Sequence, residues 1–283
     1  MLKKGVLLFC CICSAISLSA LVPSRIRASD QVSHSGPKED LTGLLLETHP
    51  ANSEKAAIEF AAGYRYCMGE GVAKDYNEAF RRFKIAAELG HSGAQYNLGY
   101  MYRKGEGVKK SPSEAVFWFS KAAEQGFPEA MFNLGVMYEL TLEMPADIDR
   151  AIYWYRKAAE KGHVAAQINL SVKLVQQARI NDFSEAFHWA RKAAYSGSPL
   201  AEYNLGTMFL KGQGVLVNYV KAESWFRKGS LQGDPLSQYA LGELYEYGSG
   251  VAKDLKEALQ WYQKAAAQGN EPAKIKILNL TTP

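Results

Sequence analysis

The sequence predicts an all-α protein, a solenoid of six helix hairpins that ends in a C-terminal capping half-repeat. Three columns of small residues carry this prediction, because each recurs about every 36 residues and a fixed period of that length indicates a repeat architecture. The first column is Gly63, Gly99, Gly135, Ser171, Gly206 and Gly242. The second is Ala79, Ala115, Ala151, Ala186, Ala222 and Ala258, and the third, which closes each unit, is Gly90, Gly126, Gly162, Gly197, Gly233 and Gly269. A single hairpin cannot bury its apolar face, so neighbouring hairpins must stack.

The first segment of each unit is predicted to be a helix that ends at a glycine turn. In repeat two, residues 94–102 precede Gly105-Glu-Gly107-Val108. Similar turns begin at Gly69, Gly212 and Gly248, and we expect them to require positive φ angles. The dinucleotide and Walker motifs need a preceding strand and a further Gly or Lys, so these glycines do not indicate a phosphate site.

The second segment is predicted to be an amphipathic helix with a complete start signal. In repeat two its apolar residues recur at helical spacing over 115–123. Ser111 is the expected N-cap, Pro112 takes the first helical position and Glu114 completes a capping box. The corresponding N-cap column is Asp75, Ser111, Asp147, Asp182, Asn218 and Asp254. Five tryptophans, one in each of repeats two to six, occupy one position of this helix, and we interpret them as core residues rather than a sugar-binding platform: Trp118, Trp154, Trp189, Trp225 and Trp261.

The predicted units follow from these columns. The solenoid covers 54–283, with repeats at 56–92, 93–128, 129–164, 165–199, 200–235 and 236–271 and a cap at 272–283. Repeats three and four lack the glycine turn at 140–145 and 176–181, so we expect the superhelix to change pitch there.

The N-terminus is predicted to be a secretory signal peptide, 1–28. Lys3 and Lys4 precede an apolar run to Val22, with cleavage expected after Ala20 or Ala28. An uncleaved membrane anchor is the alternative. Residues 29–53 are predicted to be a linker with a short apolar helix or clip at Leu41 to Glu47.

Composition excludes several function classes. From residue 28 onward acidic and basic residues balance, which disfavours nucleic acid as a partner. Cys67 is the only cysteine beyond the leader and the five histidines show no metal-ligand spacing, so neither disulfides, a metal nor a cofactor is expected. His91 and His163 follow a closing glycine and are interpreted as loop residues.

The repeated motifs resemble those of the Sel-one-like repeat (SLR) family, an α-solenoid related to tetratricopeptide repeats. The matching strings begin at Gln95 (QYNLG), Gly69 (GEGV), Trp261 (WYQKAA) and Ala122 (AAEQG). The resemblance implies a right-handed superhelix and a scaffold that binds proteins, in bacteria often exported and concerned with host, envelope or signalling partners. Some cysteine-rich relatives are described as β-lactam-directed, but this chain lacks their cysteine pairs, and its Ser-x-x-Lys (Ser35 to Lys38) has no Lys-Thr-Gly partner.

One face of the first helix is the candidate binding site. Two residues before the repeat glycine stand four asparagines, whose amides can bond the backbone of an extended peptide. The residue after the glycine lies on the same face of the helix. Arg103 and Glu139, four residues after the glycine in repeats two and three, could orient a ligand. The candidate site residues are Tyr64, Asn97, Tyr100, Arg103, Asn133, Val136, Asn169 and Asn204. The alternative is that the asparagines and tyrosines only set the stacking of repeats.

We therefore predict an exported, secreted or periplasmic, non-catalytic scaffold that binds a protein or extended peptide, such as a host or envelope protein, in its concave groove. The mature chain is expected to have no membrane span. A cell-wall or β-lactam-directed hydrolase-like enzyme and a purely structural spacer are the alternatives.

Overall fold

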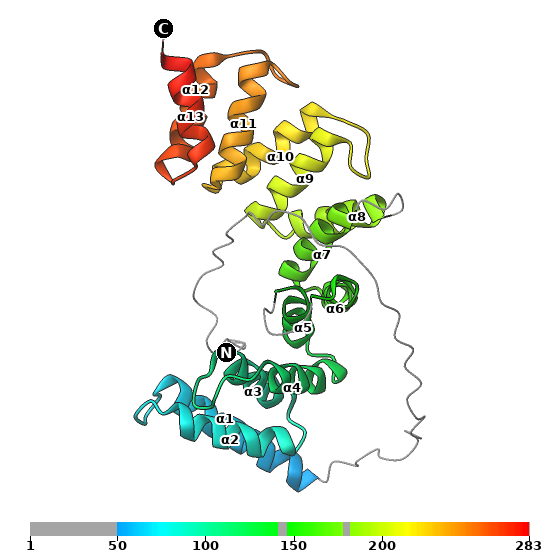
Figure 1. The fold of residues 1–283 in the computed structure, drawn as a ribbon, viewed down its shortest axis with the longest axis vertical. Helices are drawn as coiled ribbons and strands as arrows, with labels where there is room; N and C mark the ends of the chain where they lie inside the picture. Colours follow the sequence, from blue (N-terminus) through cyan, green and yellow to red (C-terminus); the bar gives the residue numbers. More distant parts are fainter. Residues whose placement is uncertain (1–49, 141–145, 178–181, 283) are drawn as a thin grey trace, which may run out of the picture.

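The computed structural model describes residues 50–140, 146–177 and 182–282, and these contain helices and no strand. The helices are α1 (Pro50–Met68), α2 (Tyr76–Glu88), α3 (Ser92–Lys104), α4 (Pro112–Glu124), α5 (Pro128–Leu140), α6 (Ile148–Glu160), α7 (Val164–Gln177), α8 (Asp182–Ala194), α9 (Pro199–Lys211), α10 (Tyr219–Leu231), α11 (Pro235–Tyr247), α12 (Leu255–Ala267) and α13 (Glu271–Thr281). Odd and even helices pair as six hairpins and α13 follows as a half-unit (Figure 1). The predicted all-α solenoid is thereby confirmed.

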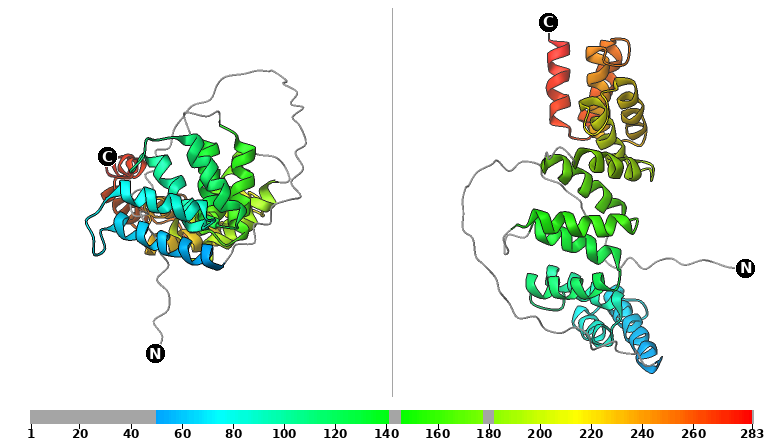
Figure 2. Two further views of the ribbon diagram at one scale, coloured as in Figure 1. Left: turned by 90° about the horizontal axis from the view of Figure 1, so that it is seen from below. Right: turned by 90° about the vertical axis from the view of Figure 1, so that its right-hand side faces the viewer.

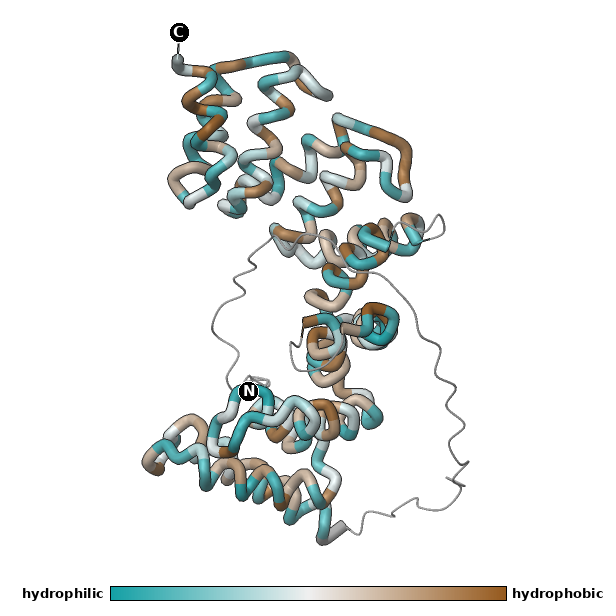
Figure 3. The backbone as a smooth tube through the Cα atoms, in the orientation of Figure 1, coloured by the Kyte–Doolittle hydropathy of each residue, from teal (hydrophilic) through white to brown (hydrophobic). Residues whose placement is uncertain are grey.

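The hairpins stack in chain order along one long axis (Figure 2). Each helix packs on its chain neighbours, and α9 also packs on α7 and α11. The first helices of repeats four to six thus contact one another directly, with no second helix between them. Polar residues occur along every helix (Figure 3), and no described helix is both long and apolar enough to cross a membrane.

The repeat glycine is small because an aromatic ring packs on it. A Cβ at Gly99 would lie 2.6 Å from the ring of Phe119, and one at Gly135 would lie 2.5 Å from the ring of Tyr155. These rings are fully buried, as are the corresponding Phe226 and Tyr262. The sequence analysis used the glycines only as markers of the period and missed the ring column.

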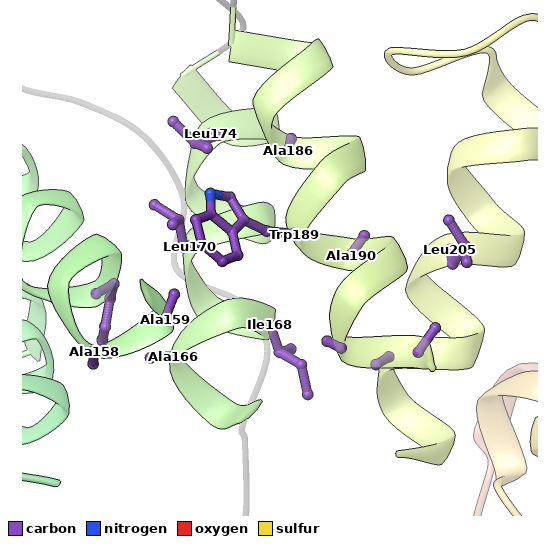
Figure 4. Close-up of a cluster of buried hydrophobic side chains, with 14 of the residues drawn as sticks. Ala158, Ala159, Ala166, Ile168, Leu170, Leu174, Ala186, Trp189, Ala190 and Leu205 are labelled. Atoms are coloured by element: carbon purple, nitrogen blue, oxygen red, sulfur yellow. The ribbon is translucent and has the colours of Figure 1, made fainter. Parts of the chain in front are cut away.

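In repeat four both residues of this contact are different. Ser171 replaces the glycine and Ala190 replaces the ring, and both are buried. The neighbouring Trp189 reaches from α8 towards Leu170 and Leu174 of α7 (Figure 4). A larger residue on one helix is therefore matched by a smaller residue on the other.

The tryptophan column is less uniformly buried than we predicted. Trp189, Trp225 and Trp261 are less than a tenth exposed, whereas Trp118 and Trp154 are half-buried. In repeats two and three the deepest position of the second helix belongs to the next residue, Phe119 or Tyr155.

The predicted N-caps are confirmed in five hairpins. Each side chain accepts a hydrogen bond from a backbone N–H in the first turn, and the residues are Asp75, Ser111, Asp147, Asn218 and Asp254. Asp182 differs, since it is the first residue of α8. The capping box at Glu114 is formed only in one direction, because the Ser111 N–H donates to the carbonyl of Tyr102 at 2.9 Å.

The Gly-x-Gly turns have the positive φ angles that we predicted, and the second glycine also makes room for the preceding repeat. A Cβ at Gly107 would lie 2.1 Å from the Tyr76 carbonyl oxygen, and one at Gly214 would lie 2.0 Å from that of Phe183. The backbone of one turn therefore lies directly against the start of the previous second helix.

The described helices begin before the predicted start of the solenoid and end in the predicted cap. Helix α1 begins at Pro50, within the segment that we assigned to the linker. In the C-terminal cap α13, Leu278 occupies the glycine column and is 62% exposed. A leucine there leaves no place for the ring of a further second helix, which fits a cap. The predicted signal peptide, the clip at Leu41 to Glu47 and most of the irregular turns at 140–145 and 176–181 lie outside the described residues.

Candidate functional site

Three predicted site residues, Tyr100, Arg103 and Asn133, come together around Tyr96 on α3 and α5. The guanidinium carbon of Arg103 lies 5.1 Å from the centre of the Tyr100 ring. Arg103 and Asn133 both act on the buried Tyr96 hydroxyl, and the carboxylate of Glu129 does so as well. Burial is the main reason that the pKa of Tyr96 is raised. We call Tyr96, Tyr100 and Arg103 the Arg103 cluster.

Two polar atoms of the Arg103 cluster are buried and unsatisfied. Nε of Arg103 has no hydrogen-bond partner among the described residues, and the hydroxyl of Tyr96 makes no full hydrogen bond there, although the Asn133 side chain interacts with it. Such atoms are uncommon in folded proteins, since each costs about 1–3 kcal/mol when left unpaired. Arg103 as a whole is half-buried, so an acceptor from a ligand can approach this side chain although its Nε is buried.

The asparagine column divides into two kinds of environment. The Asn133 amide donates to the Glu129 carbonyl of its own helix at 2.8 Å, and Asn169 interacts with the Tyr155 hydroxyl. Asn97 and Asn204 are half-buried and make no hydrogen bond through their amides within the described part of the chain. The column thus combines stacking contacts with amides that can still bind.

The remaining candidates lie beside the core. Tyr64 packs on the cluster of the first two hairpins, Tyr100 and Val136 pack on the main core, and all three are half-buried. These contacts fit the alternative that part of this row sets the stacking of first helices.

Glu139 does not lie free to orient a ligand, contrary to our expectation. Lys173 of the next repeat approaches its carboxylate at 2.5 Å, and the Tyr155 hydroxyl donates to it at 2.7 Å. Repeat six contains the same arrangement, in which Glu246 accepts from Tyr262 and from Lys276 of α13. Burial opposes the ionisation of Glu246, but these two hydrogen bonds leave its pKa lowered.

Arg103 differs from the other charged residues of its column. Four residues past the repeat glycine, the two acidic residues Glu139 and Glu246 are each bonded to a lysine of the next first helix, α7 or α13. Arg103 forms no ion pair with any described residue.

The sequence analysis also missed a glutamine contact between repeats. Gln95 donates to the carbonyl of Ala87 at 3.1 Å, and Gln125 of the next second helix donates to Gln95 at 2.7 Å and to the Gly90 carbonyl at 2.9 Å. Gln238 and Gln268 repeat this arrangement at repeats five and six. The recurrence of glutamine four residues before the repeat glycine was the available signal.

His91 and His163 lie in the connections between helices, as we predicted, and in addition they cap the helices that follow. Each Nδ1 accepts a backbone hydrogen bond at 3.2 Å, from Ala94 and from Ala166. His91 stacks on Phe60, and His163 stacks on Phe132, which is the equivalent phenylalanine of repeat three. Burial lowers the pKa of both imidazoles.

The described residues contain no group of three or more His, Cys, Asp or Glu that could hold a metal ion. Cys67, the cysteine among them, is buried.

Comparison with known proteins identifies the repeat. The Sel1 repeat model matches six consecutive spans, at 54–91, 92–127, 128–163, 164–198, 199–234 and 235–270. The chain belongs to the Sel1 repeat family. This confirms the resemblance that the motifs indicated, and Sel1 repeat proteins are generally scaffolds for protein interactions.

Two solved Sel1-type structures are similar to this chain. A protective antigen present in uropathogenic Escherichia coli strains, which displays an SLR fold, is 35% identical with a TM-score of 0.73, and the match covers 81% of this chain and 50% of the antigen. A Sel1 repeat protein from Oxalobacter formigenes is 30% identical with a TM-score of 0.68, and the match covers 83% of this chain and 92% of that protein. This Sel1 repeat chain thus spans about half the length of the antigen. No curated protein matches it significantly.

Proposed function

We propose that this Sel1 repeat protein is an exported, non-catalytic scaffold that binds a protein or an extended peptide along the inner face of its first helices. The observation that carries the proposal is the Arg103 cluster, in which a buried guanidinium nitrogen and the buried Tyr96 hydroxyl make no full hydrogen bond among the described residues. The acidic residues of the same column are already bonded to lysines. An acceptor from a partner would satisfy the cluster.

The surroundings of Arg103 suit a polypeptide ligand. Tyr100 contributes aromatic surface directly beneath the guanidinium, and the Asn97 amide stands three residues before it on the same helix face. Aromatic and arginine side chains are the residue types most often responsible for binding energy at protein interfaces. A free amide adds one donor and one acceptor for a peptide backbone.

Export is supported by the N-terminal sequence. Two lysines followed by an apolar run match a secretory signal. The similarity to a protective antigen adds support, since antigens of that kind meet the host. N-terminal sequencing of protein from the extracytoplasmic fraction should show a chain that starts after Ala20 or Ala28. An intact Met1 in a membrane pellet would instead establish an anchored protein.

The binding proposal is tested with the double substitution Asn97→Ala and Tyr100→Ala. A crosslinked pull-down from the native envelope fraction supplies the partner, and the affinity of the variant for that partner is then measured beside its melting temperature. We expect affinity to fall at least about tenfold with little change in melting, as for hot-spot residues. Leu216→Lys, at a highly exposed position outside the first helices, is the control.

Three outcomes would contradict the proposal. Unchanged affinity of the double variant would make this row structural, and the absence of any partner would favour a spacer. Hydrolysis of a chromogenic β-lactam by the purified mature protein would favour the enzyme instead. We expect no such hydrolysis, because the Ser35 to Lys38 motif has no Lys-Thr-Gly partner in the sequence.

A further inference from the structure

Exposed apolar side chains gather at one edge of repeats four to six, where each hairpin connects to the next. Tyr195 and Leu231, at the ends of the α8 and α10 segments, are 72% and 75% exposed. Leu200 and Leu236, in the first turns of α9 and α11, are 38% and 40% exposed. The Tyr195 ring lies edge-on to Trp225 of α10, so it bridges two repeats. We call these four residues the junction patch.

The other repeats provide an internal comparison. The positions of Tyr195 and Leu231 are glutamates in repeats one to three: Glu88, Glu124 and Glu160. The position of Leu200 and Leu236 is Gly93, Glu129 or Ala165 in repeats two to four. The fold therefore accepts polar or small residues at these positions, and packing does not explain the large apolar residues of the second half.

The same exchange removes from two lysines the glutamate that stands one helical turn along in other repeats. In repeats two and three, Lys121 and Lys157 stand one helical turn before a glutamate, whereas Lys192 and Lys228 stand one turn before Tyr195 and Leu231. Lys192 lies over the Trp189 ring at 5.1 Å and Lys228 over the Trp225 ring at 3.9 Å, which holds both cations beside the junction patch. Glu202 acts on Lys228 but is only 5% exposed, and Asp234 caps α11.

We propose that the junction patch is a second docking surface, which binds an acidic protein segment whose apolar side chains alternate with carboxylates. The apolar residues would cover Tyr195 and Leu231, and the carboxylates would meet Lys192 and Lys228. A second copy of the chain is a poorer occupant, because a symmetric contact would bring the lysines of both copies together. The surface lies on the second helices and junctions and is separate from the Arg103 cluster.

The test uses the residues that the chain itself has at these positions. A phage-displayed library of random peptides is selected on the wild-type protein. Peptides that also bind the full chain with Tyr195→Glu and Leu231→Glu are then removed by counter-selection. We expect the peptides that only the wild type retains to be rich in Asp and Glu interspersed with apolar residues. Affinity for one such peptide should fall at least about tenfold in the double variant and in Lys192→Gln with Lys228→Gln, while melting is unchanged.

Two controls separate this surface from others. Leu216→Lys removes a side chain that is 89% exposed at the opposite edge and matches Lys109 of repeat two, so it should leave affinity unchanged. Asn97→Ala with Tyr100→Ala should also leave it unchanged, which keeps the result independent of the inner face. If the glutamates impair folding, Leu231→Ala, as in Ala267 of repeat six, takes their place.

The proposal is overturned if the selected peptides show no acidic and apolar bias, or if the double variant binds them as well as the wild type does. It is also overturned if vesicles of phosphatidylglycerol and phosphatidylcholine bind the wild type and not the double variant, since that result would make the patch a membrane contact.

Discussion

A single methylene decides which residue can stand opposite a buried ring in this protein. A Cβ at Gly206 would lie 2.6 Å from the ring of Phe226, closer than carbon atoms can approach. Repeat four shows how the chain resolves the same conflict, with Ser171 and Ala190 at the two positions. Side-chain volume is thus shared between two helices rather than fixed at one position.

This sharing predicts a compensated double substitution. Gly206→Ser alone should destabilise the protein by about 1–3 kcal/mol through overpacking, and Phe226→Ala alone by about 3–5 kcal/mol through a cavity. Together they should cost less than the sum, with a coupling of about 1–3 kcal/mol, because the serine partly fills the space that the ring leaves. Chemical denaturation of the four proteins in the cycle measures the coupling. Additive losses would show that the exchange in repeat four depends on its other neighbours.

The two capping histidines predict a stability that depends on pH. Their pKa values are lowered in the folded chain by burial, so between the folded value and the unfolded value of about 6.5 the unfolded chain binds more protons. The contribution of the two histidines to the free energy of unfolding is therefore fully present above about pH 6.5, and it is lost as the pH falls towards their folded pKa values. Protonation also removes the Nδ1 lone pair that accepts the Ala94 or Ala166 N–H.

Replacing both histidines tests this linkage. Later repeats have Asp234 and Asn270 as side-chain caps at the equivalent position. The variant His91→Asn with His163→Asn should keep the caps and show a smaller fall in melting temperature than the wild type between pH 7.5 and pH 5.5. An equal fall in both proteins would assign the pH dependence to other groups.

At the scale of the element, the glycine turns serve two purposes that can be separated. Gly71 and Gly107 both have positive φ angles, 72° and 67°. A Cβ at Gly107 would meet the Tyr76 backbone at 2.1 Å, whereas one at Gly71, in the first repeat, would meet only the end of the Arg65 side chain at 3.3 Å. Both glycines are needed for their positive φ angle, but only Gly107 also lies against the backbone of the preceding hairpin.

We expect Gly71→Ala to cost about 1–2 kcal/mol, the conformational cost of an L-residue in this region. Gly107→Ala should cost more, about 2–5 kcal/mol, since the backbone of two repeats must also separate. Urea unfolding of both variants, followed by circular dichroism, gives the comparison. Equal losses would mean that the Tyr76 backbone moves away at no cost.

The elements could be predicted from the sequence where their causes are local. The period, the N-cap at Ser111 and the glycine turns depend on residues a few positions apart, and the structure confirms them. The bond between Glu139 and Lys173 joins residues of different repeats, and the Tyr155 hydroxyl reaches the same carboxylate. Such contacts depend on the rotation between hairpins, which no periodicity in one helix encodes. For the same reason Glu139 was mistaken for a free ligand-orienting group.

At the scale of the whole molecule, each described hairpin is stabilised by its neighbours. In repeat arrays, local stabilities and junction contacts add along the chain. Helix α13 supplies the last junction, where Ala273 is fully buried and Lys276 bonds Glu246 of α11 at 2.9 Å. The cap should therefore protect the C-terminal repeats most.

Deleting residues 271–283 should lower hydrogen-exchange protection in α11 and α12 and leave α1 to α4 nearly unchanged, because protection is lost where the junction is lost. Leu278→Ser, at a position that is 62% exposed, is the matched control and should change protection little. A uniform loss along all the helices would show that the array unfolds as one cooperative unit.

Because each hairpin stacks only on its neighbours, the molecule should be elastic along its long axis. The repeat glycine and its ring belong to the same hairpin, so a rotation of a few degrees at each junction leaves these contacts intact. The rotations add from α1 to α13 and change the distance between the two ends. Pulling the ends apart should at first stretch the coil without exposing its core. A ligand that spans several first helices would hold the coil at one length, and its binding would be read out as stiffness.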